Sequence, residues 1–457
     1  MSLRVTAALL ACRAVRLAAR ILRRGGTAKP GEIALRICPD IAAVLSRGVD
    51  CVVVTGTNGK TTSCRMIERA FAEAGLDCAA NRSGANLMSG IVTTLAACST
   101  LSGRCRKRYA VLECDEGWTK KILPALRPKV FLVTNLFQDQ VDRYGGVENA
   151  LAAIRAGVAA SPETLLCLNA DDAVSAALAH GAEKNPVVWY GLSRAAGESA
   201  GAPGAGEVTR CMLCGAELEY DYVNYAHLGA FRCPSCGHHR EEPTVCVEKI
   251  DELGLDSSTV ELRVNGKTDK VYVNQPAVYN IYNAAGAVAA AAAMGIPAED
   301  AERAVGCFDC GFGRMEKFVL GAAGARMVLV KNAAGTNQVL AFLARQSAPF
   351  DLVFVTNNRV SDGTDISWLA DAAFETLAAL PVLGDVTVSG ICAEQMLSRL
   401  RAAGVPEEKL RLRTDLGEVA ETVAAAQRPV FILPSYTGMM ELRPLLLRRC
   451  GGREFWE

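Results

Sequence analysis

The amino-acid sequence predicts an α/β protein: a first domain around a mostly parallel sheet with a phosphate-binding loop, and a smaller C-terminal α/β domain. Short apolar runs alternate with helical patterns from Val52 onward, which is the order of a parallel sheet with helices on its faces. A glycine-bounded turn follows the first run, and the same alternation starts again after Val328. A chain of 457 residues also suggests roughly two or three domains.

The overall composition excludes some classes of partner. The 49 basic and 49 acidic residues cancel, so no global field favours nucleic acid, and we expect no nucleic-acid partner. The 18 cysteines would suggest disulfides in a small secreted domain, but this chain is long and has no evident signal peptide. We therefore expect a cytoplasmic protein whose cysteines mostly behave as small hydrophobic residues.

Residues 1–48 are predicted to form an N-terminal lead-in. Residues 3–22 are apolar at helical spacing, but four arginines interrupt them, so the segment cannot span a bilayer as a continuous apolar helix. Two interpretations remain open. The segment is either a basic amphipathic helix on the inner face of a membrane, or a helix packed on its own domain with its arginines in solvent. Pro30 and Gly31 then mark a break before the first strand.

The turn after the first strand has the composition of a phosphate-binding loop. Residues 52–54 are predicted to form a buried strand and residues 63–74 a helix whose N-terminus faces the bound anion. In this geometry Lys60 reaches the β- and γ-phosphates and Thr61 is placed to ligate Mg²⁺. A plain connecting turn is the alternative, but such turns rarely need two glycines, a lysine and a threonine pair. The predicted loop comprises Gly56, Thr57, Asn58, Gly59, Lys60, Thr61 and Thr62.

Four later runs are predicted to be further strands of the same sheet: 109–113, 130–134, 164–169 and 187–190. Ligands of parallel sheets collect at the carboxyl ends of the strands, and polar residues follow these runs. They are Glu113, Asp115 and Glu116 after one run, Asn135, Asp139, Asp142 and Arg143 after another, and Asn169, Asp171 and Asp172 after a third.

A flexible low-complexity linker at 195–206 precedes an insertion, residues 207–242. The insertion contains two Cys-x-x-Cys pairs with eighteen residues between them, which is the spacing of a four-cysteine zinc site. Four cysteines leave no open position on the metal, so Zn²⁺ would stabilise a small ribbon and would not take part in catalysis. The predicted ligands are Cys211, Cys214, Cys233 and Cys236. A second pair, Cys307 and Cys310, has no partner pair nearby and is interpreted as unremarkable.

After the ribbon, residues 259–264 and 270–273 are predicted to be a strand pair and 284–294 an alanine-rich helix. Residues 311–315 are predicted to be a hinge. Strands at 352–355, 386–389 and 430–433 then alternate with helices as a second α/β domain.

Four motifs together resemble the Mur ligase family, ATP-dependent enzymes that activate a carboxylate as an acyl phosphate, which an amine then attacks. The motifs are residues 56–62, 168–172, 280–283 and 313–316. The resemblance implies a central ATP-binding domain over 49–318 and a C-terminal domain over 319–457. It also implies roles for single residues: Glu113 would hold Mg²⁺, Asn280 and Asn283 would approach the adenine or ribose, and Arg314 would contact phosphate. Lys331, which stands where related ligases carry a histidine, would also contact phosphate, with an ordinary exposed lysine as the alternative.

A narrower set of motifs, 331–337, 362–368 and 434–437, together with the zinc ribbon, resembles the ligase subunits of lipid II isoglutaminyl synthases. That resemblance implies amidation of the α-carboxylate of D-glutamate in the lipid II stem peptide, with ammonia from a GatD-type glutaminase subunit in a heterodimer. It also implies that Asp365 completes the Cys-His pair of the glutaminase across the interface, as a triad acid does. From sequence physics alone, Asp362 and Asp365 would be a turn and a helix N-cap.

Two other functions stay open on the sequence. A stand-alone Mur-type ligase that adds an amino acid would need its own amino-acid pocket and would leave Asp365 unexplained. A non-catalytic ATP-binding zinc-ribbon protein would not need carboxylates at Glu113, Asp115 and Glu116 beside the phosphates. The chain also departs from the family pattern at Ala277, where a glycine is usual before Asn280, which puts the geometry of that turn in doubt.

Overall fold

The structure is a computed structural model that describes residues 3–21, 27–81, 85–137, 146–194, 208–254, 256–308, 314–320, 322 and 324–450. Its described part forms two compact units, with residues up to Phe308 in unit 1 and residues from Arg314 onward in unit 2. Several predicted features lie outside the described residues: Asp139, Asp142, Arg143, the linker 195–206, Cys310 and the hinge residues 311–313. Among the helices of the described residues, none is both long and apolar enough to cross a membrane.

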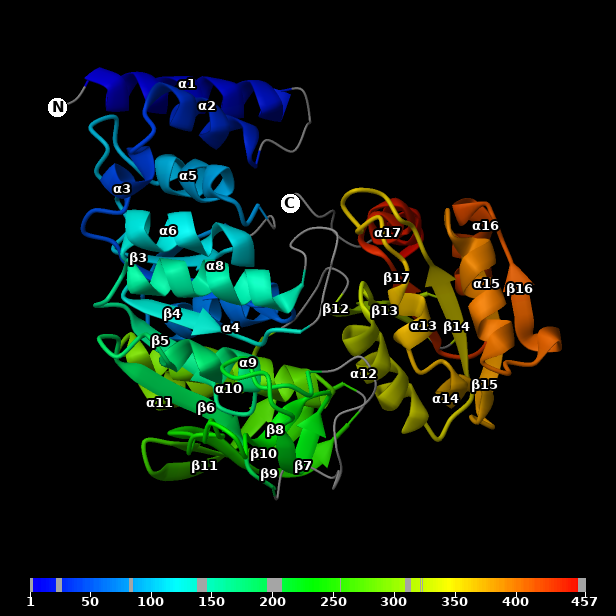
Figure 1. The fold of residues 1–457 in the computed structure, drawn as a ribbon. Coiled ribbons are helices and arrows are strands. Elements are labelled where there is room, and N and C mark those ends of the chain that lie inside the picture. The colour runs from blue at the N-terminus through cyan, green and yellow to red at the C-terminus, as the bar shows by residue number, and fades with distance from the viewer. Residues whose placement is uncertain are drawn as a thin grey trace. The chain divides into compact units, whose positions relative to one another are not determined.

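Unit 1 is built on a nine-stranded sheet in the order β11-β10-β9-β6-β5-β4-β1-β3-β2 (Figure 1). The neighbouring strands β2, β3, β1, β4, β5, β6 and β9 run parallel. The strands β9, β10 and β11 form an antiparallel extension. The strands are β1 (Asp50–Thr55), β2 (Cys78–Ala80), β3 (Tyr109–Glu113), β4 (Val130–Val133), β5 (Leu165–Asn169), β6 (Val187–Leu192), β9 (Val245–Leu253), β10 (Ser258–Val264) and β11 (Lys267–Val273). The predicted parallel sheet and the predicted strand pair are confirmed.

Helices cover both faces of this sheet. The helices α4, α10 and α11 pack together, and α1, α2, α3, α5, α6 and α8 share one hydrophobic core with the strands on the other side. The helices are α1 (Leu3–Ile21), α2 (Lys29–Ile37), α3 (Ile41–Leu45), α4 (Lys60–Glu73), α5 (Met88–Ala97), η1 (Glu116–Trp118), α6 (Thr119–Leu126), α8 (Val147–Ala159), α9 (Ala173–Ala176), η2 (Ala177–Ala179), α10 (Val278–Ala293) and α11 (Ala298–Gly306). Strands buried on both faces read as continuous apolar runs, which is why 52–54 and 130–133 lack alternation.

The alanine-rich helix is longer than the sequence predicted. Helix α10 begins at Val278, six residues before the predicted start. The prediction missed these residues because the polar Asn280 and Asn283 lie within the first two turns of the helix. Asn283 therefore lies inside the helix and does not cap it. The N-cap position is Ala277, which has a φ of 73°, a conformation that favours glycine.

The insertion predicted to be a zinc ribbon lies between β6 and β9, two neighbouring parallel strands. It contains the hairpin β7 (Glu219–Tyr225) and β8 (Leu228–Arg232). Phe231 of this hairpin packs on Ala173 and Ala176 of α9, so the insertion shares a small core with the rest of unit 1.

Unit 2 is a six-stranded sheet in the order β12-β13-β17-β14-β15-β16, parallel except for the edge pair β12 and β13. Its strands are β12 (Arg314–Phe318), β13 (Ala325–Val328), β14 (Phe350–Val355), β15 (Leu383–Ser389), β16 (Leu410–Leu412) and β17 (Val430–Pro434). Its helices are α12 (Ala333–Ala344), α13 (Trp368–Asp371), α14 (Glu375–Ala378), α15 (Ala393–Ala402), η4 (Glu407–Lys409), α16 (Leu416–Ala425) and α17 (Tyr436–Cys450). The predicted C-terminal α/β domain is confirmed, and Arg314–Phe318, which the predicted limits assign to the first domain, form its edge strand.

Candidate active site

The predicted phosphate loop joins β1 to α4 at the carboxyl end of the central strands of unit 1. Gly59 is the N-cap of α4 with a φ of 83°, and Gly56 has a φ of 130°. A Cβ atom at Gly56 would lie 2.2 Å from Thr134 Oγ1, and one at Gly59 would lie 1.9 Å from Asn283 Oδ1. Both positions therefore require glycine, for backbone conformation and for space. The loop approaches the N-terminus of a fourteen-residue helix, which is a favourable place for phosphate.

The two residues that follow β4, Thr134 and Asn135, bind the loop through hydrogen bonds. Asn58 N donates to Asn135 Oδ1 at 2.9 Å, and Thr134 Oγ1 donates to Asn58 O at 2.6 Å. Thr57 N donates to Asn135 O at 2.8 Å, so both loop residues are fixed by backbone and side-chain bonds. Asn58 Nδ2 is buried and has no hydrogen-bond partner among the described residues. A buried donor without a partner is costly, and an anionic ligand would satisfy it.

Lys60 is the first residue of α4, and its side chain turns back over the loop. Its Nζ lies 2.9 Å from Glu116 Oε1 and donates to the backbone oxygens of Gly56 and Thr57. Burial acts to lower the pKa of Lys60, but the charges of Glu116 and Glu113 outweigh it, so the pKa is raised. The side chain is therefore cationic at neutral pH and available to neutralise phosphate.

Thr61 and Glu113 converge beside the lysine. Thr61 Oγ1 donates to Glu113 Oε2 at 2.8 Å, which brings a hydroxyl and a carboxylate oxygen together at the end of β3. Asn81 holds the backbone of Glu113 through two bonds, from Glu113 N at 2.8 Å and to Glu113 O at 2.9 Å. Asn86 Nδ2 lies 3.4 Å from Glu113 Oε1. Oxygen donors of this kind fit Mg²⁺, which prefers one or two carboxylates plus phosphate and water.

Helix α10 brings two asparagines to the loop. Asn283 Nδ2 donates to Asn280 Oδ1 at 3.2 Å, and Asn280 Nδ2 donates to Pro276 O at 2.8 Å. Ser63 Oγ of α4 donates to Asn283 O at 3.4 Å, so the two helices are joined at the loop. Both asparagines are buried and structurally engaged, and their predicted contacts with adenine or ribose stay predictions.

The polar residues after β5 turn inward. Asp171 accepts bonds from Arg240 Nε at 2.7 Å, Tyr282 OH at 2.6 Å and Leu192 N at 2.8 Å. Desolvation raises the pKa of Asp171, against the attraction of Arg240. The carboxylate therefore joins the ribbon, strand β6 and helix α10.

Asp172 makes a second junction of this kind. Its Oδ2 accepts from Leu136 N at 2.8 Å, and its Oδ1 lies 3.1 Å from His227 Nε2 of the ribbon. Asp172 also caps α9 through a bond from Val174 N at 3.0 Å. Both aspartates bind protein groups, so they are part of the scaffold.

The four predicted metal ligands come together. Their sulfur atoms all lie within 4.8 Å of one another, and this is the candidate metal cluster among the described residues. Cys211 Sγ lies 3.6 Å from Cys236 Sγ, and Cys214 Sγ lies 3.4 Å from Cys233 Sγ. A tetrahedral ion with bonds of ~2.3 Å separates sulfurs by about 3.8 Å, so the cluster fits zinc. Gly215 and Gly237, which follow the second cysteine of each pair, both have positive φ, as tight turns require.

The carboxyl ends of the strands in unit 2 carry the Asp-Gly-x-Asp segment. Asp362 is buried and accepts from Thr437 N at 2.6 Å and from Thr437 Oγ1 at 2.6 Å, so it fixes the segment on α17. Asp365 is exposed and accepts from Ser367 N at 2.7 Å and Ser367 Oγ at 2.8 Å. These bonds lower the pKa of Asp365, which keeps it ionised. The N-cap of α13 is Ser367, so Asp365 forms a surface turn and not the cap.

Two further predicted phosphate contacts, Arg314 and Lys331, belong to unit 2. Arg314 is the first residue of β12, and the placement of its side chain is outside the described part. Lys331 precedes Asn332, which caps α12 through a bond from Gly335 N at 2.7 Å. The roles of Arg314 and Lys331 stay predictions.

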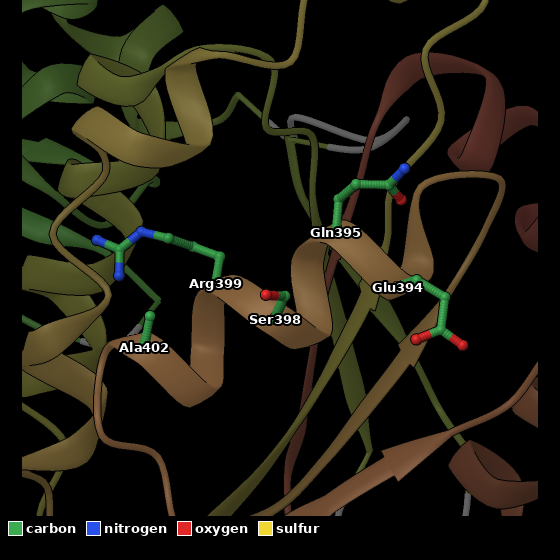
Figure 2. Close-up of a pocket in the computed structure, with 5 residues that line it drawn as sticks. All are labelled: Glu394, Gln395, Ser398, Arg399 and Ala402. Atoms are coloured by element: carbon green, nitrogen blue, oxygen red, sulfur yellow. The ribbon is translucent and has the colours of Figure 1, made fainter.

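Unit 2 also has a shallow depression of about 540 Å³ on one side of α15 (Figure 2). Its lining residues are Glu394, Gln395, Ser398, Arg399 and Ala402. Arg399 is already engaged, with bonds to Leu369 O at 2.9 Å and Ala372 O at 2.7 Å. All the lining residues belong to unit 2, so the depression is not part of the loop site in unit 1.

Several residues that complete the site were not singled out from the sequence. Asn81 and Asn86 position Glu113, and Thr134 supports Asn58. The signal for the two asparagines was the polar segment that follows a short strand, the same signal that identified Glu113. Thr134 is the last residue of a predicted strand, and its sequence context does not distinguish it.

Comparisons with known proteins agree with this geometry. The family described as "Mur ligase middle domain" matches residues 54–210, and "MurT ligase C-terminal" matches residues 329–439. The chain is 33% identical to the lipid II isoglutaminyl synthase (glutamine-hydrolyzing) subunit MurT of Streptococcus pneumoniae over 98% of each chain. It is 29% identical to the same subunit of Staphylococcus aureus strain COL over 96% of each chain.

Among solved structures, the chain resembles MurF from Acinetobacter baumannii with a TM-score of 0.66 and 17% identity, covering 91% of this chain and 80% of that one. At that identity the likeness shows the fold. Full-length similarity to the MurT subunits shows more: the chain belongs to the MurT family and has the Mur ligase fold.

Proposed function

We propose that the chain is the ATP-dependent ligase subunit of a lipid II isoglutaminyl synthase. The substrate is the α-carboxylate of D-glutamate in the stem peptide, and the product is D-isoglutamine. The observation that carries the proposal is the convergence of Lys60, Thr61 and Glu113 at a glycine loop in a chain that belongs to the MurT family. A ligase of this class forms a C–N bond at the expense of ATP.

The residues of the loop fit ATP and Mg²⁺. Glycines at 56 and 59 open the backbone to phosphate, Asn58 Nδ2 is an unsatisfied donor, and Lys60 supplies positive charge. Thr61 and Glu113 would hold Mg²⁺, which neutralises the developing charge on the transferring phosphoryl group. Predicted contacts from Arg314 and Lys331 would come from unit 2.

The reaction consists of two steps, a phosphoryl transfer followed by an acyl transfer to ammonia. A carboxylate oxygen of D-glutamate attacks the γ-phosphorus of ATP, the bond to the bridging oxygen breaks, and ADP leaves. Ammonia then attacks the acyl carbon, phosphate leaves, and the nitrogen loses a proton to give the amide. Lys60 stabilises charge in the first transfer by position alone, because no covalent bond to the protein is needed.

The source of ammonia is a partner subunit, for which we propose a GatD-type glutaminase in a heterodimer. Free ammonia is scarce as the uncharged nucleophile at neutral pH, so its release beside the acyl phosphate raises its effective concentration. Asp365 suits a role in the partner's site because it is exposed and kept ionised by Ser367. A triad acid orients a histidine in this way without taking up the proton.

Zinc and location complete the proposal. The cluster of Cys211, Cys214, Cys233 and Cys236 fits a structural Zn²⁺, which would fold the ribbon against unit 1. The protein would act in the cytoplasm, at the inner face of the membrane where a lipid-linked substrate is exposed.

The test is glutamine-dependent amidation of lipid II, measured by mass spectrometry with the partner subunit present. Wild type is compared with Asp365→Asn, with Lys60→Met and with Asp371→Asn, a matched control at another exposed aspartate of the same region. We expect Asp365→Asn to lose activity with glutamine and to recover it with ammonium salt. We expect Lys60→Met to lose both, and Asp371→Asn to keep both.

Two outcomes would count against the proposal. If ammonium does not restore Asp365→Asn, this residue serves the ligase or the fold and not the partner. If wild type adds an amino acid instead of amidating lipid II, the chain is a stand-alone Mur-type ligase.

A further inference from the structure

Helix α1 has two apolar faces, and only one of them is used for folding. Val5, Ala8, Leu9 and Cys12 are buried in the core of unit 1. In Figure 1, α1 and α2 form the outer layer of the helices on this side of the unit 1 sheet. Packing on its own domain therefore accounts for one side of the helix and leaves the composition of the other side unexplained.

The opposite face is apolar and exposed. Leu3, Leu10, Leu17 and Ile21 are exposed by 86%, 52%, 60% and 73%. Their spacing of seven, seven and four residues places them on one line along the helix. The exposed residues between them on this face are alanines: Ala7, Ala14 and Ala18. Single exposed apolar residues are normal, but a continuous line over five turns marks a contact surface.

The edges of this apolar face are basic. Arg4 and Arg13 flank this face and are exposed, and α1 contains no acidic residue. A neighbouring loop, residues 98–108, lies along the helix: Thr6 Oγ1 donates to Leu101 O at 3.2 Å, and Arg13 donates to Ser99 O. Together the two segments 3–21 and 98–108 contain eight basic residues and no acidic one, in a chain whose net charge is zero.

A row of leucines flanked by arginines has the composition of a helix that lies in a membrane interface. The apolar side chains enter the boundary between headgroups and acyl chains, and each arginine near an anionic surface adds attraction. A second copy of the chain would bring like charges together at the same face, which opposes self-association.

We propose that the outward face of α1, with the loop 98–108, docks unit 1 on an anionic phospholipid bilayer. The inference deepens the proposed function, because a docked ligase would meet its lipid-linked substrate in two dimensions. Its test involves no turnover, so a failure here leaves the proposed ligase activity untouched.

The experiment is co-sedimentation of the full chain with vesicles of phosphatidylcholine, with and without phosphatidylglycerol. We expect wild type to bind only the anionic vesicles, and salt to weaken the binding. Leu10→Gln with Leu17→Gln should lower the binding constant at least about tenfold, since two leucines no longer enter the lipid. Arg4→Glu should lower it severalfold.

Matched controls lie in unit 2. Val319 is 89% exposed and Arg413 is exposed, and Val319→Gln and Arg413→Glu should bind as wild type does. All variants should keep the circular dichroism spectrum and melting temperature of wild type, because none removes a buried contact. The proposal is overturned if wild type ignores anionic vesicles, or if the two leucine substitutions leave binding unchanged. It is also overturned if they convert a dimer in sedimentation equilibrium into a monomer without changing vesicle binding.

Discussion

Gly59 and Asn283 form a contact whose energy can be measured by a double-mutant cycle. Alanine at 59 must adopt a φ of 83°, which costs about 1–2 kcal/mol for a residue with a Cβ atom. The same Cβ would lie 1.9 Å from Asn283 Oδ1, and relieving such an overlap costs about 1–3 kcal/mol. Gly59→Ala should therefore destabilise unit 1 by about 2–5 kcal/mol.

The second half of the cycle separates the two costs. Asn283→Ala removes the bond to Asn280 and should cost about 1 kcal/mol. In the double variant the overlap is gone and the cost of the positive φ remains. Its destabilisation should be smaller than the sum of the single effects by about 1–3 kcal/mol.

The assay is calorimetric unfolding without nucleotide, in which about 1 kcal/mol corresponds to roughly 2 °C for a unit of this size. The matched control is Gly75→Ala, because Gly75 has a φ of 70° but nothing within 4 Å of its Cβ position. That variant should show the cost of the backbone and no coupling to Asn283→Ala. Additive effects of Gly59→Ala and Asn283→Ala, within about 0.5 kcal/mol, would refute the contact between loop and helix.

Three other predictions concern metal, charge and a buried ion pair. Cys214→Ser should lose one bound zinc per chain by elemental analysis and lower the melting temperature, because a structural zinc contributes folding energy. Asp365, whose pKa is lowered by Ser367, should contribute stability that is present above about pH 4 and lost as the pH falls through its folded-state pKa, and Ser367→Ala should raise that pKa in a carbon NMR titration. Glu316→Gln should destabilise unit 2 by about 3 kcal/mol in urea unfolding, since it leaves the buried Arg443 without its carboxylate.

Each of these three has a control in the chain. Cys307 is exposed and outside the cluster, so Cys307→Ser should keep its zinc. Asp385→Asn should leave the titration of Asp365 unchanged, because Asp385 pairs with Arg411. Glu441 makes a surface pair with Arg359, so Glu441→Gln should cost less than about 1 kcal/mol. Equal losses for Glu316→Gln and Glu441→Gln would contradict the burial argument.

The parts of the fold that depend on local pattern were predictable. Apolar runs with turn signals gave the parallel strands, and the Cys-x-x-Cys spacing gave a cluster whose sulfurs do lie together. The start of α10 was not predictable, because the first turns of that helix are polar and its N-cap, Ala277, has a positive φ that sequence preference argues against. Tertiary packing of α10 on α4 overrides the local preference there.

The candidate site divides in the same way. Lys60 and Thr61 were predictable, because a phosphate loop is a short local motif. The hydrogen bonds from Asn81 to the backbone of Glu113 were not predictable, because the two residues are 32 positions apart and meet only when β2 pairs with β3. The sequence likewise placed Asp171 and Asp172 at the correct end of a strand but could not show whether they face a ligand or the protein.

Because those two aspartates bind protein groups, they connect the ribbon to the nucleotide loop through hydrogen bonds. His227 of the ribbon bonds Asp172, Asp172 accepts from Leu136 N, and the residue before Leu136 is Asn135, which holds Asn58.

Asp171 makes a second link, because it binds both Arg240 of the ribbon and Tyr282 OH, one residue before Asn283. Partner groups that are buried and charged are expensive to leave unpaired, so a ribbon that unfolds without metal would disturb both aspartates. A zinc ion held by the four cysteines would therefore stabilise the geometry of the loop. Removal of zinc should therefore weaken nucleotide binding as well as lower the melting temperature.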